Sequence, residues 1–147
     1  MYQYSQISQL NKNFKKSFSI LFLIIVALII NSCGSDKSEE FTVVKNIQVG
    51  AFDKTLAVKG EQIFKAKCVA CHKYDERLVG PALGKVTKRR TADYILSMIT
   101  APDRMLANND TTKVLLKTYM TSMTNQNVTL EDARAIYEHL RDIANSR

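Results

Sequence analysis

The chain contains the sequence Cys68-Val69-Ala70-Cys71-His72 near its centre. If it forms one helical turn, its two thiols lie within reach of both vinyl groups of a haem. The imidazole that follows directly is then aimed at the haem iron. We therefore interpret Cys68 and Cys71 as sites of covalent haem attachment and His72 as an iron ligand.

Two other interpretations of the paired cysteines have to be weighed against haem. A thioredoxin-like dithiol requires a strand-helix-strand setting, which the helical pattern of this sequence does not offer. A zinc site requires a fourth ligand, and His139 is the only other histidine, without the spacing of a zinc finger. The histidine directly after the second cysteine and the export signal described next both favour haem.

The first 32 residues have the pattern of an export signal. Lys12, Lys15 and Lys16 precede an unbroken apolar run of 11 residues at positions 20–30. A signal-peptide core has this length, whereas a membrane-spanning helix needs roughly 20 residues. We therefore predict that residues 1–32 are a signal peptide.

The apolar run stops just before a cysteine. The hexapeptide Ile29-Ile30-Asn31-Ser32-Cys33-Gly34 resembles the lipobox at which bacterial lipoprotein precursors are lipidated and cleaved. The resemblance implies that acyl chains on Cys33 hold the protein on a membrane of the cell envelope, facing the periplasm. Each buried methylene would contribute about 0.8 kcal/mol. Cleavage elsewhere without lipid and an uncleaved anchor helix are the alternatives.

The rest of the chain divides into a linker and a domain. Residues 33–52 form the linker: positions 34–40 are small and polar and predict a flexible tether, whereas positions 41–52 alternate weakly and predict an extended strap on the domain. Residues 53–147 then form the single folded domain.

Charge and cysteine count narrow the class of protein. The formal net charge is +7, but residues 1–32 contribute three lysines and no acids, which leaves 18 basic and 14 acidic side chains, a net +4. Such a surplus is too small to indicate nucleic-acid binding. Lipid on Cys33 and haem on the other two cysteines leave no thiol for a disulfide, although the compartment is oxidising.

Periodic apolar residues and capping residues predict an all-α domain of about four short helices. Asp53 caps a helix over residues 53–67, Thr91 caps a second that Pro102 closes, a third follows Asp110, and Thr129 begins the last. Such a small domain buries little apolar surface of its own. A large apolar cofactor would complete the core.

The pattern of residues 53–143 resembles class I c-type cytochromes. In that family a glycine and an aromatic residue precede the cysteine motif, as Gly60 and Phe64 do here. The resemblance implies a small cytochrome c fold in which the first and last helices cross at Gly60. His139 stands where the family packs an aromatic residue, so we predict packing rather than haem ligation for it.

Gly80-Pro81-Ala82-Leu83 matches a further segment of the family. The resemblance implies that the carbonyl of Pro81 accepts a hydrogen bond from the second ring nitrogen of His72, which orients the ring and makes it a better donor to iron. Taken alone, Gly80-Pro81 would equally indicate an ordinary turn.

The sixth iron ligand has several candidates among the downstream methionines. The family places it in the loop before the last helix, and Met123 lies six residues before Thr129, although Thr124 replaces the usual proline. We predict Met123 as the ligand. Met120 and Met105 are alternatives, and Met98 belongs to an apolar helical stripe.

Basic residues surround the predicted haem. Residues 85–90, followed by Tyr94, resemble the segment that meets the haem propionates in the family, so we expect contacts from Arg89 and Tyr94. The alternative is that residues 85–90 are a solvated basic loop without contact to the haem. Lysines at positions 65, 67 and 73 flank the cysteine motif and predict a redox partner that is acidic near its contact site.

The resemblance implies a carrier of single electrons with no catalytic residue, no small-molecule substrate and one covalent haem c. It would link respiratory complexes to a terminal reductase or oxidase. Residues 74–81 and 123–129 are also similar to small lipoprotein cytochromes associated with nitrous-oxide reductase systems. A peroxidase-like enzyme or gas sensor would instead need an open iron face and, for catalysis, a distal acid-base group.

Overall fold

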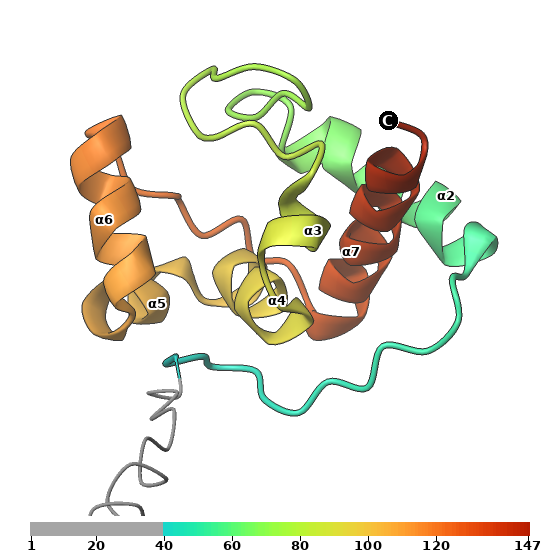
Figure 1. The fold of residues 1–147 in the computed structure, drawn as a ribbon, viewed down its shortest axis with the longest axis horizontal. Coiled ribbons are helices and arrows are strands. Elements are labelled where there is room, and N and C mark those ends of the chain that lie inside the picture. The colour runs from blue at the N-terminus through green and yellow to red at the C-terminus, as the bar shows by residue number, and fades with distance from the viewer. Residues whose placement is uncertain (1–39) are drawn as a thin grey trace, which may run out of the picture. The chain divides into compact units, whose positions relative to one another are not determined.

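Six helices and no strand follow one another in residues 40–147, the part of the chain that the computed structural model describes (Figure 1). They are α2 (Lys54–Lys67), α3 (Val86–Arg89), α4 (Ala92–Thr100), α5 (Pro102–Asn108), α6 (Asp110–Tyr119) and α7 (Leu130–Asn145). The predicted all-α fold is confirmed. The predicted signal peptide, Cys33 and nearly all of the tether lie outside the described residues.

The predicted capping residues begin the longer helices. Asp53, Thr91 and Thr129 each accept a hydrogen bond from the backbone N–H three positions on, at 2.9, 3.2 and 3.1 Å. Asn109 caps α6 in the same way, one residue before the expected start. Side-chain caps satisfy N–H groups that the first turn of a helix leaves unpaired.

The described residues hold two more helices than the four that the sequence predicted. α3 is a single turn, too short to show apolar periodicity. α5 begins at Pro102, directly after α4 ends at Thr100. Proline ends one helix and suits the first turn of the next, because neither position requires its missing N–H. The end of α4 at this proline was predicted, whereas the start of α5 was not.

α2 and α7 cross at Gly60, as predicted. A Cβ atom at this position would overlap with the carbonyl oxygen of Ala135 in α7. Only glycine therefore lets the two backbones approach this closely. The cysteine motif continues from the C-terminal end of α2, seven residues beyond Gly60 (Figure 1).

His139 packs beside this crossing, as the sequence predicted, with 4% of its surface exposed. Its ring centroid lies 5.5 Å from that of Phe64 and 5.8 Å from that of Tyr74. The hydroxyl of Tyr74 is 2.8 Å from its Nε2 atom. His139 therefore takes the place of an aromatic residue between α2 and α7.

The strap, residues 41–52, runs in an extended course to α2 (the cyan segment in Figure 1). Two of its consecutive amides donate to the hydroxyl of Ser97 at 2.9 and 2.8 Å, and two more donate to the carboxylate of Asp93 at 2.8 and 2.9 Å. The side-chain amide of Asn109 donates to the carbonyl of Phe41 at 2.7 Å. These bonds attach the strap to α4 and to the start of α6.

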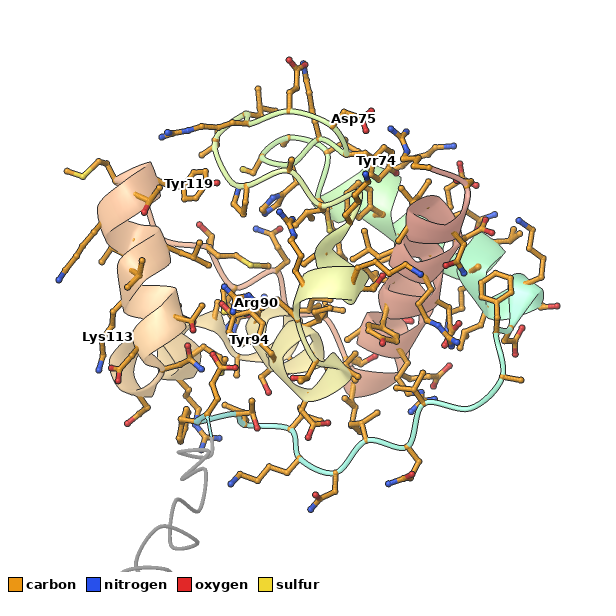
Figure 2. All side chains as sticks on the ribbon, viewed as in Figure 1. Tyr74, Asp75, Arg90, Tyr94, Lys113 and Tyr119 are labelled. Atoms are coloured by element: carbon orange, nitrogen blue, oxygen red, sulfur yellow. The ribbon has the colours of Figure 1, made fainter. Side chains whose placement is uncertain are left out.

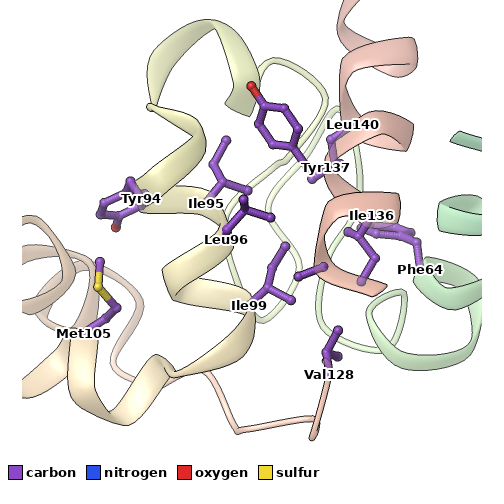
Figure 3. Packing of buried hydrophobic residues seen from close by; sticks show 11 residues of the cluster. Phe64, Tyr94, Ile95, Leu96, Ile99, Met105, Val128, Ile136, Tyr137 and Leu140 are labelled. Atoms are coloured by element: carbon purple, nitrogen blue, oxygen red, sulfur yellow. The ribbon is translucent and has the colours of Figure 1, made fainter. Parts of the chain in front are cut away.

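Most of the buried apolar residues form one cluster, which lies mainly on α2, α4 and α7 and includes one residue of α5 and one just before α7 (Figure 3). It contains Phe64, Tyr94, Ile95, Leu96, Ile99, Met105, Val128, Ala133, Ile136, Tyr137 and Leu140. No helix within residues 40–147 is both long and apolar enough to cross a membrane.

Candidate haem site

A cavity of about 380 Å³ opens beside the cysteine motif. One wall comes from positions 67–83, and the other comes from α4, α6 and positions 121–126. The lining is mainly apolar and includes Phe64, Ile95 and Leu115. A cavity of this kind suits a flat apolar group. Such a group would add the apolar surface that a small domain cannot bury by itself.

The cysteine motif forms a turn at the end of α2. The N–H of Cys68 donates to the carbonyl of Phe64 at 2.8 Å, and the N–H of His72 donates to the carbonyl of Cys68 at 2.9 Å. Both thiols are free and both line the cavity. Burial raises the pKa of the free Cys68 thiol to about 11. The structure thus brings Cys68, Cys71 and His72 to one cavity.

The ring of His72 is held on one side by the segment that follows. Its Nδ1 atom lies 3.0 Å from the carbonyl oxygen of Pro81. Because a carbonyl only accepts, Nδ1 carries the proton and Nε2 keeps its lone pair for a metal. A Cβ at Gly80 would overlap with Cε1 of the ring. Glycine at this position therefore makes room for the oriented imidazole.

The described methionines occupy different environments. Met123 is half-buried and lines the cavity, and so does Met98, whose sulfur lies 3.4 Å from the hydroxyl of Thr112. Met105 is fully buried in the core, and Met120 is 83% exposed at the end of α6. Neither of these two lines the cavity. Met123 remains the predicted ligand, and Met98 is a cavity residue that its place in a helical stripe concealed.

Arg89 and Tyr94, the residues expected near the propionates, both line the cavity. Arg89 donates to the carbonyl of Ala82 at 2.9 Å. The hydroxyl of Tyr94 is 3.4 Å from that of Thr112, and desolvation raises the pKa of Tyr94, so it remains a hydrogen-bond donor. Arg90 lies over the Tyr94 ring at 5.2 Å (Figure 2).

The three lysines beside the motif have partners within the chain. Lys65 pairs with Glu61 at 2.7 Å, and Lys73 pairs with Glu76 at 2.6 Å. Lys67 donates to the carbonyl of Gln126 at 3.0 Å. Exposed ion pairs of this kind are weak, so they reduce but do not remove the positive field around the motif.

The wall formed by α6 was missed by the sequence analysis. Leu115, Leu116 and Tyr119 line the cavity from this helix. Their spacing of three and four residues indicates an apolar face, but the helix packs mainly on the short α5 rather than on the core. This apolar face, which the core does not cover, was the signal in the sequence that could have indicated a cavity wall.

An all-α domain whose Cys-x-x-Cys-His turn faces an apolar cavity, with the histidine bonded to a proline carbonyl, defines the class of c-type haem proteins. The family model described as cytochrome c matches residues 57–144. The chain belongs to the cytochrome c family.

Relatives of known structure cover most of the domain. A cytochrome c from Rhodothermus marinus is 43% identical, with a TM-score of 0.69 over 71% of this chain and 90% of that chain. An engineered form of that cytochrome matches with a TM-score of 0.67 over 69% of this chain and 90% of that chain.

Curated relatives match over shorter segments. Cytochrome c2 of Rhodopseudomonas palustris is 53% identical over 34 residues, and cytochrome c-551 of Pseudomonas denitrificans is 58% identical over 31 residues. These segments are 23% and 20% of this chain, and 29% and 38% of the relatives. The chain therefore matches well under half the length of either relative.

Proteins of the cytochrome c family carry covalently bound haem c, and haem c is the cofactor of this chain. The residues around the cavity fit it: two free thiols, an imidazole with its Nε2 available and a thioether all line one apolar space. The bound haem supplies a metal centre that gains and loses one electron.

Proposed function

We propose that this protein is a monohaem electron carrier. Cys68 and Cys71 would hold the haem covalently, and His72 and Met123 would both bind its iron. The observation that carries the proposal is the joint position of the His72 ring, bonded to Pro81, and Met123 at one apolar cavity. With two protein ligands the iron would offer no open position to a substrate and would gain or lose an electron with little rearrangement.

Arg89 and Tyr94 are the residues that we propose for the propionates. Both line the cavity, and each offers a donor that a carboxylate accepts. The guanidinium of Arg89 already donates to a carbonyl of the cysteine-bearing wall, which keeps it close to the site.

Spectroscopy of the purified haem protein tests the ligand set. The oxidised wild type should show the near-infrared sulfur-to-iron charge-transfer band, and Met123→Ala should abolish it. Met120→Ala is the matched control, because that side chain lies outside the cavity and should leave the band intact. A wild type that lacks the band and readily binds carbon monoxide would contradict the carrier, and loss of the band in Met120→Ala alone would reassign the ligand.

We also propose that acyl chains on Cys33 anchor the carrier to a membrane facing the periplasm. The support is the lipobox-like sequence before this cysteine and the polar residues that follow it. Mass spectrometry of the purified N-terminus tests it, with Cys33→Ala as the comparison. An acylated Cys33 is expected, whereas an unmodified N-terminus at another residue or an intact leader would overturn the anchor.

We propose redox proteins as partners, namely a quinol-oxidising complex or another cytochrome as donor and a terminal reductase or oxidase as acceptor. Nitrous-oxide reductase is the acceptor to test first, because residues 74–81 and 123–129 are similar to cytochromes of those systems. The reduced carrier should be oxidised by that enzyme only when nitrous oxide is present. No oxidation under these conditions would exclude this acceptor.

The contact site of the partner is proposed to be acidic. Lysines 65, 67 and 73 stay exposed despite their partners within the chain. The association rate should therefore fall as salt is added, although less steeply than three unpaired lysines would give. A rate that rises with salt would contradict an acidic partner.

A further inference from the structure

The segment that carries Met123 has few contacts with the protein core. α6 ends at Tyr119, and the one buried residue of this helix, Thr112, lies in its first turn. Met120 then adopts a left-handed conformation, with φ 56°, and is 83% exposed. The C-terminal end of α6 and positions 120–127 therefore add no residue to the buried core, which the chain rejoins only at Val128.

Two contacts join this segment to the opposite wall of the cavity. On one side of Met123, the guanidinium of Arg77 lies 4.6 Å from the ring centroid of Tyr119. On the other side, the ammonium of Lys67 donates to the carbonyl of Gln126 at 3.0 Å. In Figure 2 the ring of Tyr119 lies at the end of α6 that is nearest to the loop after the cysteine motif.

The wall that supplies the two cations is itself well ordered by hydrogen bonds. Lys67 is the last residue of α2. The loop with Arg77 is fixed at its two ends, because the N–H of Gly80 donates to the carbonyl of Cys71 at 2.9 Å and the N–H of Gly84 donates to that of Tyr74 at 2.8 Å. The cations thus start from fixed positions and reach across to the less supported segment.

We infer that Arg77 and Lys67 are positioning residues that hold the Met123 segment closed over the cavity. Met123 lies four residues after Tyr119 and three before Gln126, so the two contacts bracket it. The inference rests on the proposed ligation of the iron by Met123. It adds the residues that control how often Met123 dissociates from the iron. A cation within about 6 Å of an aromatic ring is attracted to its face, and a charged donor strengthens a hydrogen bond.

Imidazole binding to the oxidised haem protein tests the inference, because at saturating imidazole its rate is limited by opening of the Met123 segment. Arg77→Gln and Tyr119→Leu should each raise this rate about two- to fivefold. The double variant should open no faster than either single variant, because both remove one contact. Tyr119→Phe keeps the ring and should behave like the wild type.

Matched variants separate the contacts from charge. Arg104→Gln on α5 removes an exposed arginine, and Lys65→Gln removes the lysine two positions before Lys67, which pairs with Glu61 instead, so both should leave the rate unchanged. Lys67→Gln should raise it about two- to tenfold, and its effect should multiply with that of Arg77→Gln, because the contacts are separate. If Arg77→Gln and Arg104→Gln bind imidazole at the same rate, the role of Arg77 is overturned. Equal rates in Lys67→Gln and Lys65→Gln would overturn the role of Lys67.

Hydrogen exchange gives a readout that does not depend on the iron ligand. Amides at positions 117–123 should exchange faster in Arg77→Gln and Tyr119→Leu than in the wild type, and should not change in Arg104→Gln. If Met123→Ala leaves the charge-transfer band intact, Met123 is not the ligand. Hydrogen exchange still tests the contact between Arg77 and Tyr119 in that case. Unchanged exchange in Arg77→Gln would overturn the positioning role.

Discussion

The hydroxyl of Tyr74 lies 2.8 Å from Nε2 of His139, and the two residues join the loop after the cysteine motif to α7. Nε2 accepts this bond only when the imidazole is neutral. Desolvation, the main cause, lowers the pKa of His139 below the ordinary value of 6.5, although Glu61 and Asp142 act in the opposite direction.

This relationship predicts a specific dependence of stability on pH. Because the folded pKa of His139 is lowered, the unfolded chain binds the extra proton more readily, and stability is lost as pH falls below about 6.5 towards the folded pKa. The thermal midpoint should therefore decrease on acidification in this range. His139→Phe should reduce the decrease, and an equal pH dependence in the variant would refute the assignment.

Gly60→Ala should destabilise the domain. A methyl group here overlaps with the carbonyl of Ala135, and overpacking of this kind costs about 1–3 kcal/mol, more than alanine gains in helix propensity. Denaturant unfolding measures the difference. Gly50→Ala is the control, because a Cβ at Gly50 meets no atom within 4 Å. Similar stabilities of the two variants would show that α2 and α7 can move apart freely.

Gly80→Ala should disturb His72, the proposed iron ligand, more than the fold. The added methyl pushes the His72 ring away from the carbonyl of Pro81 and weakens that bond. A histidine that donates less to iron stabilises the oxidised state less, so the reduction potential should rise by about 20–60 mV for the loss of one hydrogen bond. Redox titration checks this value, and a lowered potential would contradict the role of Pro81.

Asp93→Ala should loosen the strap. Two strap amides lose a charged acceptor, which should destabilise the protein by about 1.5–3 kcal/mol and speed amide exchange at positions 46 and 47. Asp103→Ala is the control, since Asp103 also occupies the first turn of a helix but is exposed on α5. If both variants lose the same stability, the effect belongs to the helix terminus and not to the strap.

Local sequence signals predicted more features of the fold than signals that depend on residues far apart in the chain. The caps at Asp53, Thr91 and Thr129 and the glycine at the helix crossing depend on local geometry or on a family pattern, and the structure agrees with them. α3 and α5 escaped prediction because helices of four and seven residues are too short for an apolar period to appear.

The cavity was harder to predict than the cysteine motif. Met98 and Met123 both line it, yet one lies on a helix and the other in a loop, so spacing alone does not bring them together. The wall from α6 depends on how α5 directs the chain after Pro102, which no local pattern specifies. The contact of Arg77 joins residues 42 positions apart, and that of Lys67 joins residues 59 positions apart. No sequence pattern predicts either contact.

The attachment of the strap determines where a mechanical load would enter the domain. A pull applied at residue 40 first meets the hydrogen bonds of Asn109 and Ser97, which lie on the α5–α6 junction and on α4. The bonds of Asn46 and Ile47 to Asp93 come next, so all of these attachments lie between residue 40 and α2 along the chain. Tension on the preceding chain therefore enters the domain at α4 and at the start of α6, far along the chain from the cysteine motif.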